Sequence, residues 1–228
     1  MDYDLQVENF TIEKEMYYKN TLVLSFKISY PQFRSSCFAA AVNEMNRYYK
    51  TKAFSFKRYC ERQMYPAAVK EYEYSVANGF PVRKHEAQVD YTITYQQDCA
   101  VSLYFDQYQF TGGAHGNTVR YSQTWNLQTG CRIRLEQLFP CQANYKIFLI
   151  QTINSQIAEQ IQNGHNDYFE NYSELVADTF QPESFYLTPE GLAVYFQQYD
   201  IAPYSSGIPV FIIPYSECTV VRPVCKRL

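Results

Sequence analysis

The spacing of apolar side chains changes period several times along this 228-residue chain, and this constrains the fold more than any other feature. From Leu24 to Ile28 apolar and polar residues alternate, as in a strand with one buried face. Together with the β-branched and aromatic residues that precede it from Val7 onward, this pattern predicts one or two extended strands. Pro31 is expected to end this strand region, because proline cannot donate to a sheet ladder.

The next block, from about residue 33 to residue 78, has a helical period instead. An interruption is expected near Pro66, and the Asn78-Gly79 pair is a typical helix stop. The apolar stripe that predicts this helix consists of Phe38, Val42, Met45 and Tyr49.

A return to alternation then predicts sequential strands joined by turns, which favours an antiparallel meander. The predicted strands are residues 89–95, 101–105 and 119–127, and a short fourth strand around Ile133 and Leu135.

A second helix is predicted over residues 145–161, where apolar residues recur every four positions. Three short strands are expected after it, at 184–187, 192–196 and 210–213. The pattern as a whole predicts an α+β fold, with an antiparallel sheet, amphipathic helices packed on it, and two intimately packed lobes.

The charge of the chain argues against nucleic acid as a partner. Its net charge is −3 and its pI is near 5.7. Nucleic-acid binding depends on a concentrated positive face. No stretch approaches the roughly 18 consecutive apolar residues of a membrane span.

The first residues, Met1 to Asp4, lack the basic and apolar regions of a secretory leader. Two interpretations of the compartment follow: a cytosolic protein, or the mature part of an extracytoplasmic one.

Seven cysteines are widely and irregularly spaced, and no CxxC pair occurs. A structural zinc site therefore has little support. In an oxidising compartment six of the seven thiols could pair, with a connectivity that spacing does not define. The alternative is that they are small apolar core residues.

The sequence contains no recognisable catalytic motif: HExxH, GxSxG, P-loop and dinucleotide fingerprints are all missing. The three histidines are His85, His115 and His165. A thiol nucleophile formed by Cys99 or Cys131 with His115 is a weak alternative. We therefore predict no enzyme activity, no cofactor and no metal site.

Two polar and aromatic loops are the candidate binding regions. In the first, Gly112, Gly113 and His115 could form a small site for an anion or carbonyl group, or the glycines could merely shape the backbone while His115 caps the loop. In the second, Tyr199, Tyr204 and Ser205 could contact a partner, since tyrosines in loops suit recognition, or the two rings could pack on the sheet.

Several segments together resemble one known family. They are the loop at 112–116 with the following Trp125-Asn126-Leu127, the segments 185–196 and 199–207, Ile213-Pro214-Tyr215, and the opening Tyr30-Pro31 and residues 43–46. In this order they resemble the envelope domain shared by RsiV-type anti-sigma factors and PdaC-type peptidoglycan deacetylases. The resemblance implies a PdaC-like N-terminal lobe at 1–84 and an RsiV-like C-terminal lobe at 85–228.

The resemblance also implies an extracytoplasmic binding module, secreted or membrane-anchored. In the anti-sigma factors the domain binds lysozyme, and in the deacetylases it accompanies a separate catalytic domain. This chain contains neither the sigma-binding segment and membrane helix nor the deacetylase domain. We therefore expect a non-catalytic cell-envelope module that recognises a protein such as lysozyme, or alternatively a peptidoglycan or other cell-wall glycan. A hydrolase of unfamiliar type is the remaining alternative. The oligomeric state is left open.

Overall fold

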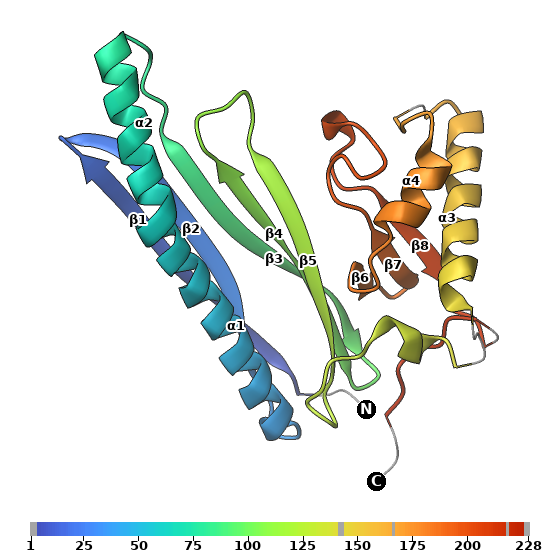
Figure 1. Cartoon of the computed structure of the whole chain (residues 1–228). Coiled ribbons are helices and arrows are strands. Elements are labelled where there is room, and N and C mark those ends of the chain that lie inside the picture. Colours follow the sequence, from blue (N-terminus) through green and yellow to red (C-terminus); the bar gives the residue numbers. More distant parts are fainter. Residues whose placement is uncertain (1–3, 141–143, 166, 218, 226–228) are drawn as a thin grey trace. The chain divides into compact units, whose positions relative to one another are not determined.

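The structure, a computed structural model, describes residues 4–140, 144–165, 167–217 and 219–225 (Figure 1). The strands are β1 (Gln6–Tyr18), β2 (Thr21–Arg34), β3 (His85–Gln97), β4 (Ala100–Phe110), β5 (Asn117–Asn126), β6 (Phe185–Leu187), β7 (Gly191–Tyr195) and β8 (Val210–Pro214). The α-helices are α1 (Ala39–Tyr59), α2 (Tyr65–Asn78), α3 (Tyr145–Gln162) and α4 (Tyr172–Thr179). A π-helix, η1 (Cys60–Met64), joins α1 to α2, and η2 (Leu135–Leu138) and η3 (Tyr204–Ser206) are 3-10 turns. This arrangement confirms the predicted α+β class.

The chain forms two compact units. Unit 1 comprises residues 1–91 and 105–119, and unit 2 comprises residues 92–104 and 120–228. Strands β3, β4 and β5 contribute to both units, so each unit is discontinuous in sequence. The division into lobes at residues 1–84 and 85–228 stays a prediction.

The five-stranded sheet has the order β1-β2-β3-β4-β5 and is mixed. β2 pairs antiparallel with β1 but parallel with β3, in the register Leu24 to His85 through Ile28 to Val89. The α1-η1-α2 segment between β2 and β3 is the long helical crossover that a parallel pair requires. The expectation of a purely antiparallel sheet is therefore wrong for this pair, because the local pattern of each strand does not show which way its neighbour runs.

The predicted end of the strand at Pro31 is also wrong, since β2 continues to Arg34. Pro31 lies opposite Asn9 of β1, and β3 pairs with β2 only as far as Ile28. At Pro31 the register gives the strand a neighbour on its β1 side alone, and a missing N–H is tolerated where a strand has one neighbour.

The predicted interruption of the first long helix is confirmed, and its form is the π-helix η1. The N–H of Tyr65 is bonded to the carbonyl of Cys60, five residues earlier. Pro66 follows directly after η1, within the first turn of α2. α2 ends as predicted at Gly79, whose φ is +69°.

The predicted fourth strand near residue 133 does not form. Ile133 donates one backbone bond to Thr124, but the side chain of Gln137 then accepts from the N–H of Arg134 at 2.8 Å and turns the chain into η2. Leu135 and Leu138, three residues apart, are buried by this turn. A 3-10 turn thus replaces the alternation expected of a strand.

Unit 2 is built around α3, which covers the antiparallel sheet β6-β7-β8 (Figure 1). The three short strands and the helix were predicted, and the four-residue spacing places Leu149, Ile153 and Ile157 in the core with no exposed surface. In unit 1 the predicted stripe of α1 packs on the sheet, where the ring of Tyr49 lies 5.3 Å from that of Phe105. No helix in the described part of the chain has the length and apolar character needed to cross a membrane.

Candidate functional site

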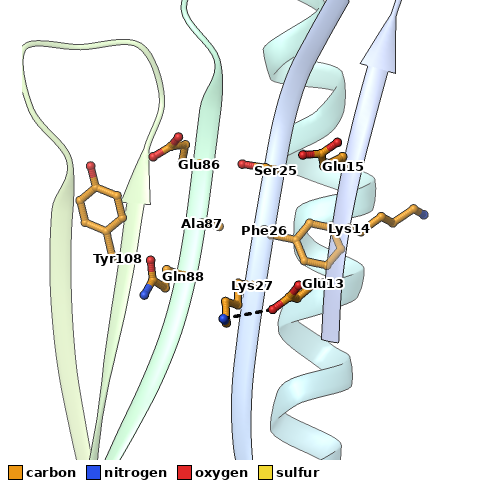
Figure 2. Close-up of a pocket in the computed structure, with 10 residues that line it drawn as sticks. All are labelled: Glu13, Lys14, Glu15, Ser25, Phe26, Lys27, Glu86, Ala87, Gln88 and Tyr108. Atoms are coloured by element: carbon orange, nitrogen blue, oxygen red, sulfur yellow. Dashed lines mark ion pairs between the residues drawn. The ribbon is translucent and has the colours of Figure 1, made fainter. Parts of the chain in front are cut away.

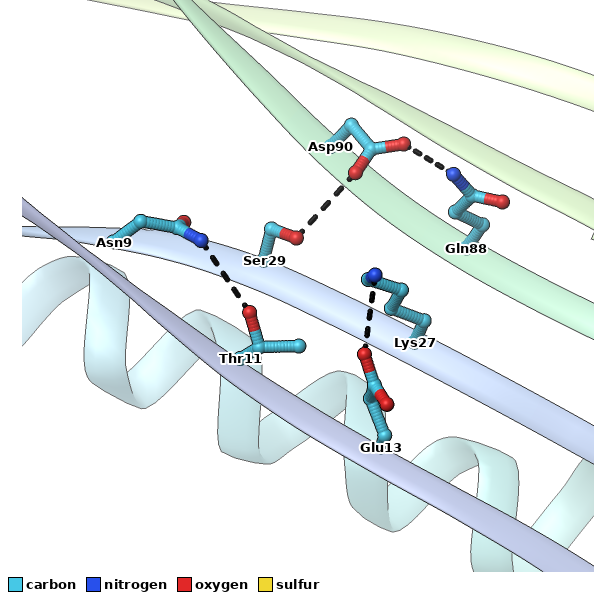
Figure 3. A network of polar contacts seen from close by, with 7 residues as sticks. All are labelled: Asn9, Thr11, Glu13, Lys27, Ser29, Gln88 and Asp90. Atoms are coloured by element: carbon cyan, nitrogen blue, oxygen red, sulfur yellow. Dashed lines mark hydrogen bonds and ion pairs between the residues drawn. The ribbon is translucent and has the colours of Figure 1, made fainter.

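The five-stranded sheet carries a polar face in unit 1, on the side of β1, β2 and β3 away from α1 and α2 (Figure 3). Along β2 the side chains of Leu24, Phe26 and Ile28 are buried under the helices, so the intervening positions point the other way. The residues of β1 and β3 that pair with these intervening positions of β2 lie on the same side of the sheet. We call the resulting surface the open face, and it comprises Thr11, Glu13, Glu15, Ser25, Lys27, Ser29, Glu86, Gln88, Asp90 and Tyr108.

A hollow of about 670 Å³ lies on this surface (Figure 2). Glu13 and Glu15 of β1, Ser25 and Lys27 of β2, Glu86 and Gln88 of β3, and Tyr108 of β4 contribute polar groups to its lining. Figure 2 shows these side chains projecting from four successive strands. The hollow is wide and polar, as suits an extended polar ligand better than a small apolar one.

Polar side chains of the open face hold one another in place (Figure 3). Lys27 forms an ion pair with Glu13 at 3.1 Å. Asp90 accepts from the amide of Gln88 and from the hydroxyl of Ser29, the latter at 3.4 Å. These contacts orient carboxylate and amide groups at the surface before any ligand arrives, which lowers the ordering cost of binding.

The open face is acidic. It carries the carboxylates of Glu13, Glu15, Glu86 and Asp90 against the ammonium groups of Lys27 and of Lys84, which forms an ion pair with Glu86 at 2.6 Å. This surface would repel a polyanion and accept neutral hydroxyl groups or cations.

Tyr108 presents its aromatic ring at the edge of the hollow (Figure 2). The ring packs against Gly116, where a Cβ atom would overlap the ring carbons. Gly116, in the loop before β5, therefore leaves room for the ring of Tyr108. Sequence reasoning did not find this role because the contact joins the loop to a residue of β4.

The predicted loop site at Gly112, Gly113 and His115 lies in unit 1, between β4 and β5. Gly112 has a φ of +88°, which favours glycine. Arg83 donates to the carbonyls of Gly112 and Gly113, at 2.7 Å each. The exposed ring of His115 has its Nδ1 atom 2.9 Å from the carbonyl of Gly116. These contacts fit the interpretation in which His115 caps the loop, and a ligand role for it stays a prediction.

The second predicted loop belongs to unit 2, and the structure brings its tyrosines together. Tyr199 has a φ of +70° and is 52% exposed, and its ring centroid lies 5.9 Å from that of Tyr204. Ser205 is exposed beside them. Asp200 fixes the loop by accepting from the N–H of Gln197 at 2.7 Å, and burial raises the pKa of this carboxyl group. The six predicted residues thus form two clusters, one in each unit.

Two of the cysteines that the structure describes are unsuited to act as a nucleophile, whereas a thiol nucleophile formed by the exposed Cys131 with His115 stays a prediction. Cys99 is bonded to Cys225 in a disulfide, so it is not a nucleophile. Burial raises the pKa of the Cys60 thiol to about 12, which keeps it protonated at neutral pH. Within the described ranges no three histidine, cysteine or acidic side chains converge in a way that could hold a metal ion.

Comparisons with known protein families match two segments of the chain. Residues 18–118 match the family model described as Deacetylase PdaC, and residues 136–216 match the model of a protein family of unknown function, DUF3298. The peptidoglycan-N-acetylmuramic acid deacetylase PdaC of Bacillus subtilis (strain 168) is 23% identical over 188 residues. That match covers 75% of this chain but only 37% of the relative's length.

Two solved structures share the fold. A DUF3298 family member from Bacteroides fragilis NCTC 9343 has a TM-score of 0.75 and 16% identity, over 97% of this chain and 95% of its own. A DUF3298 family protein from Pseudomonas aeruginosa PAO1 has a TM-score of 0.59 and 18% identity, over 94% of this chain and 92% of its own. The likeness to RsiV-type anti-sigma factors stays a prediction. The predicted resemblance to the PdaC-like domain family is confirmed, with a PdaC-matching segment at residues 18–118 followed by a DUF3298 segment at 136–216.

Proposed function

We propose that this chain is a non-catalytic binding module of the cell envelope and that it holds a cell-wall glycan on the open face. The observation that carries the proposal is the hollow of about 670 Å³ lined by carboxylate, amide, hydroxyl and phenol groups from four strands. Such groups can hydrogen-bond to the hydroxyls of several sugar units in a row. Tyr108 offers a ring on which a sugar face can stack.

The relatives support the choice of ligand. The similar protein from Bacillus subtilis is named a deacetylase of peptidoglycan N-acetylmuramic acid, and this chain matches only 37% of it. A match to only part of this enzyme is consistent with an accessory module. Such a module would keep the cell-wall polymer close to a separate catalytic domain. The disulfide between Cys99 and Cys225 supports an extracytoplasmic location, because such bonds persist in oxidising compartments.

Sedimentation with purified peptidoglycan tests this function. The wild-type chain should appear in the pellet, and the double substitution Glu86→Ala/Gln88→Ala should weaken binding about tenfold through the loss of charge-assisted and amide hydrogen bonds. Tyr199→Ala, in unit 2, is the control and should sediment like the wild type. Retention of the wild-type chain in the supernatant would contradict the proposal.

A protein partner such as lysozyme is a second candidate, and the tyrosine pair of unit 2 is the observation that favours it. Tyr199 is half exposed on a loop fixed by Asp200, and aromatic anchors of this kind are frequent at protein interfaces. Calorimetry with several muramidases decides this case. Binding that Tyr199→Ala weakens and Glu86→Ala/Gln88→Ala does not would support it, and uniform absence of heat would remove it.

A further inference from the structure

The helical layer of unit 1 has a surface opposite in charge to the open face. Residues 47–62 of α1 and η1 contain six cations and one carboxylate, that of Glu61. The segment thus carries +5 while the whole chain carries −3, which leaves −8 for the remaining residues. The cations are Arg47, Lys50, Lys52, Lys57, Arg58 and Arg62.

Helical geometry gathers part of this charge on the solvent side of α1. Lys50, Phe54 and Arg58 are separated by four residues each, so they lie on one stripe. All three are exposed, and together with Thr51 they line a depression of about 310 Å³. On the opposite side of the helix, Val42, Met45 and Tyr49 are buried. The stripe is therefore the outer surface of unit 1.

Several of these cations are not neutralised by the protein itself. Arg47 is paired with Glu44 at 2.6 Å, and Lys57 lies 4.0 Å from Glu61. Among the residues that the structure describes, no carboxylate lies within ion-pair distance of Lys50 or Arg58, and Arg58 is held only by the hydroxyl of Ser55 at 3.0 Å. These two cations are available to an external anion.

Exposed aromatic rings lie among the cations. Phe54 is 38% exposed, and Tyr59, stacked on Phe56 with centroids 5.7 Å apart, is 37% exposed. The ammonium group of Lys57 lies 5.9 Å from the Phe54 ring. A soluble polyanion would interact with the cations alone. An anionic bilayer surface would interact with both kinds of group, because aromatic rings lie at the level of the lipid headgroups and cations lie close to the lipid phosphates.

We propose that this stripe of α1, comprising Lys50, Phe54 and Arg58 with the flanking Tyr59 and Arg62, docks unit 1 onto the surface of a bilayer that contains anionic phospholipid. The docking is peripheral: the rings reach the interface and the helix lies flat on it. The open face, on the other side of the same sheet, stays exposed to its own ligand.

Co-sedimentation with vesicles tests the proposal on the full chain. Vesicles of phosphatidylcholine with phosphatidylglycerol should bind the protein, and vesicles of phosphatidylcholine alone should not. Each cation near an anionic surface is worth about fivefold in partitioning, so Lys50→Ser/Arg58→Ser should lower the partition coefficient about thirtyfold. About 1 M salt, where the Debye length is about 3 Å, should release most of the protein.

The matched control is Arg34→Ser/Lys146→Ser, which removes the same charge from exposed positions outside the stripe and should bind like the wild type. Phe54→Ser should weaken binding while leaving its salt dependence in place. Equal loss in the control, or binding to inorganic polyphosphate without binding to the anionic vesicles, would overturn the proposal. Because neither double variant touches the open face, sedimentation with peptidoglycan should be unchanged in both.

Discussion

The disulfide between Cys99 and Cys225 should make a large contribution to the stability of the chain, because it closes a long loop. The two residues are 126 positions apart. In the chain-entropy model a bridge over a loop of this length removes about 5 kcal/mol of disorder from the unfolded state at 25 °C. Breaking it in the variant Cys225→Ser should lower the free energy of unfolding by up to that amount.

The folded state should survive the loss of the bond, which makes the prediction measurable. Val220 is fully buried, and the N–H of Val221 donates to the carbonyl of Leu138 at 2.9 Å, so packing and hydrogen bonding also hold this part of the tail. The expected change therefore lies in the unfolded chain, which becomes more expanded and exposes more surface to denaturant.

Urea unfolding followed by circular dichroism gives both quantities. Cys225→Ser should show a lower midpoint and a steeper dependence on urea than the wild type. Replacing the exposed free cysteines Cys37 and Cys131 by serine is the control and should leave the curve in place. A loss under about 1 kcal/mol, with an unchanged slope, would refute the loop-entropy reasoning.

Two further predictions concern unit 1 and unit 2 separately. Burial lowers the pKa of His85, against a smaller raising effect of Glu71, so the unfolded chain binds a proton more readily than the folded chain. The free energy of unfolding should therefore fall as the pH drops from about 7 to 5. Urea unfolding repeated across that pH range should show a smaller fall in the variant His85→Phe. In Gly191→Ala the new Cβ would overlap the backbone carbonyl of Ile213 on the paired strand β8, so thermal unfolding should show a loss of about 1–3 kcal/mol in the free energy of unfolding. The control Gly113→Ala, whose Cβ would meet only the carbonyl oxygen of His115 at 3.9 Å, should change that free energy by under about 0.5 kcal/mol.

The elements with strong periodicity were predictable from sequence. The stripe containing Leu149 and Ile153 gave the position of α3, since one side of a helix must be buried whatever it packs against. The predictions for the strands before α3 were wrong where contacts with residues distant in sequence decide whether a strand continues or ends. Strand β2 continues through Pro31 because its pairing with β3 ends at Ile28. Ile133 donates a single backbone hydrogen bond to Thr124 before the side chain of Gln137 turns the chain. No local pattern contains these contacts.

The candidate site was predictable only in part, for a related reason. The segments containing His115 and Tyr199 were identified correctly as irregular connections between strands, but the positive φ of Tyr199 was not anticipated. The open face was not identified, although the alternation of Ser25, Lys27 and Ser29 with apolar residues is visible in the sequence. Alternation shows that a strand has a polar side, but only the position of α1 and α2 shows which side of the sheet these helices leave uncovered.

Net charge was the least informative quantity, because it averages over two surfaces of opposite sign. The value of −3 argued correctly against a uniformly basic protein, yet it concealed the +5 of residues 47–62 and the four carboxylates of the open face. The two groups lie on opposite sides of one sheet, since β2 alternates between Phe26 under the helices and Lys27 on the open face. Unit 1 can therefore present an acidic surface on its sheet to one ligand and a basic surface on its helical layer to another. At about 1 M salt the two activities should separate, because attraction to lipid phosphates is screened while hydrogen bonds to neutral sugars persist.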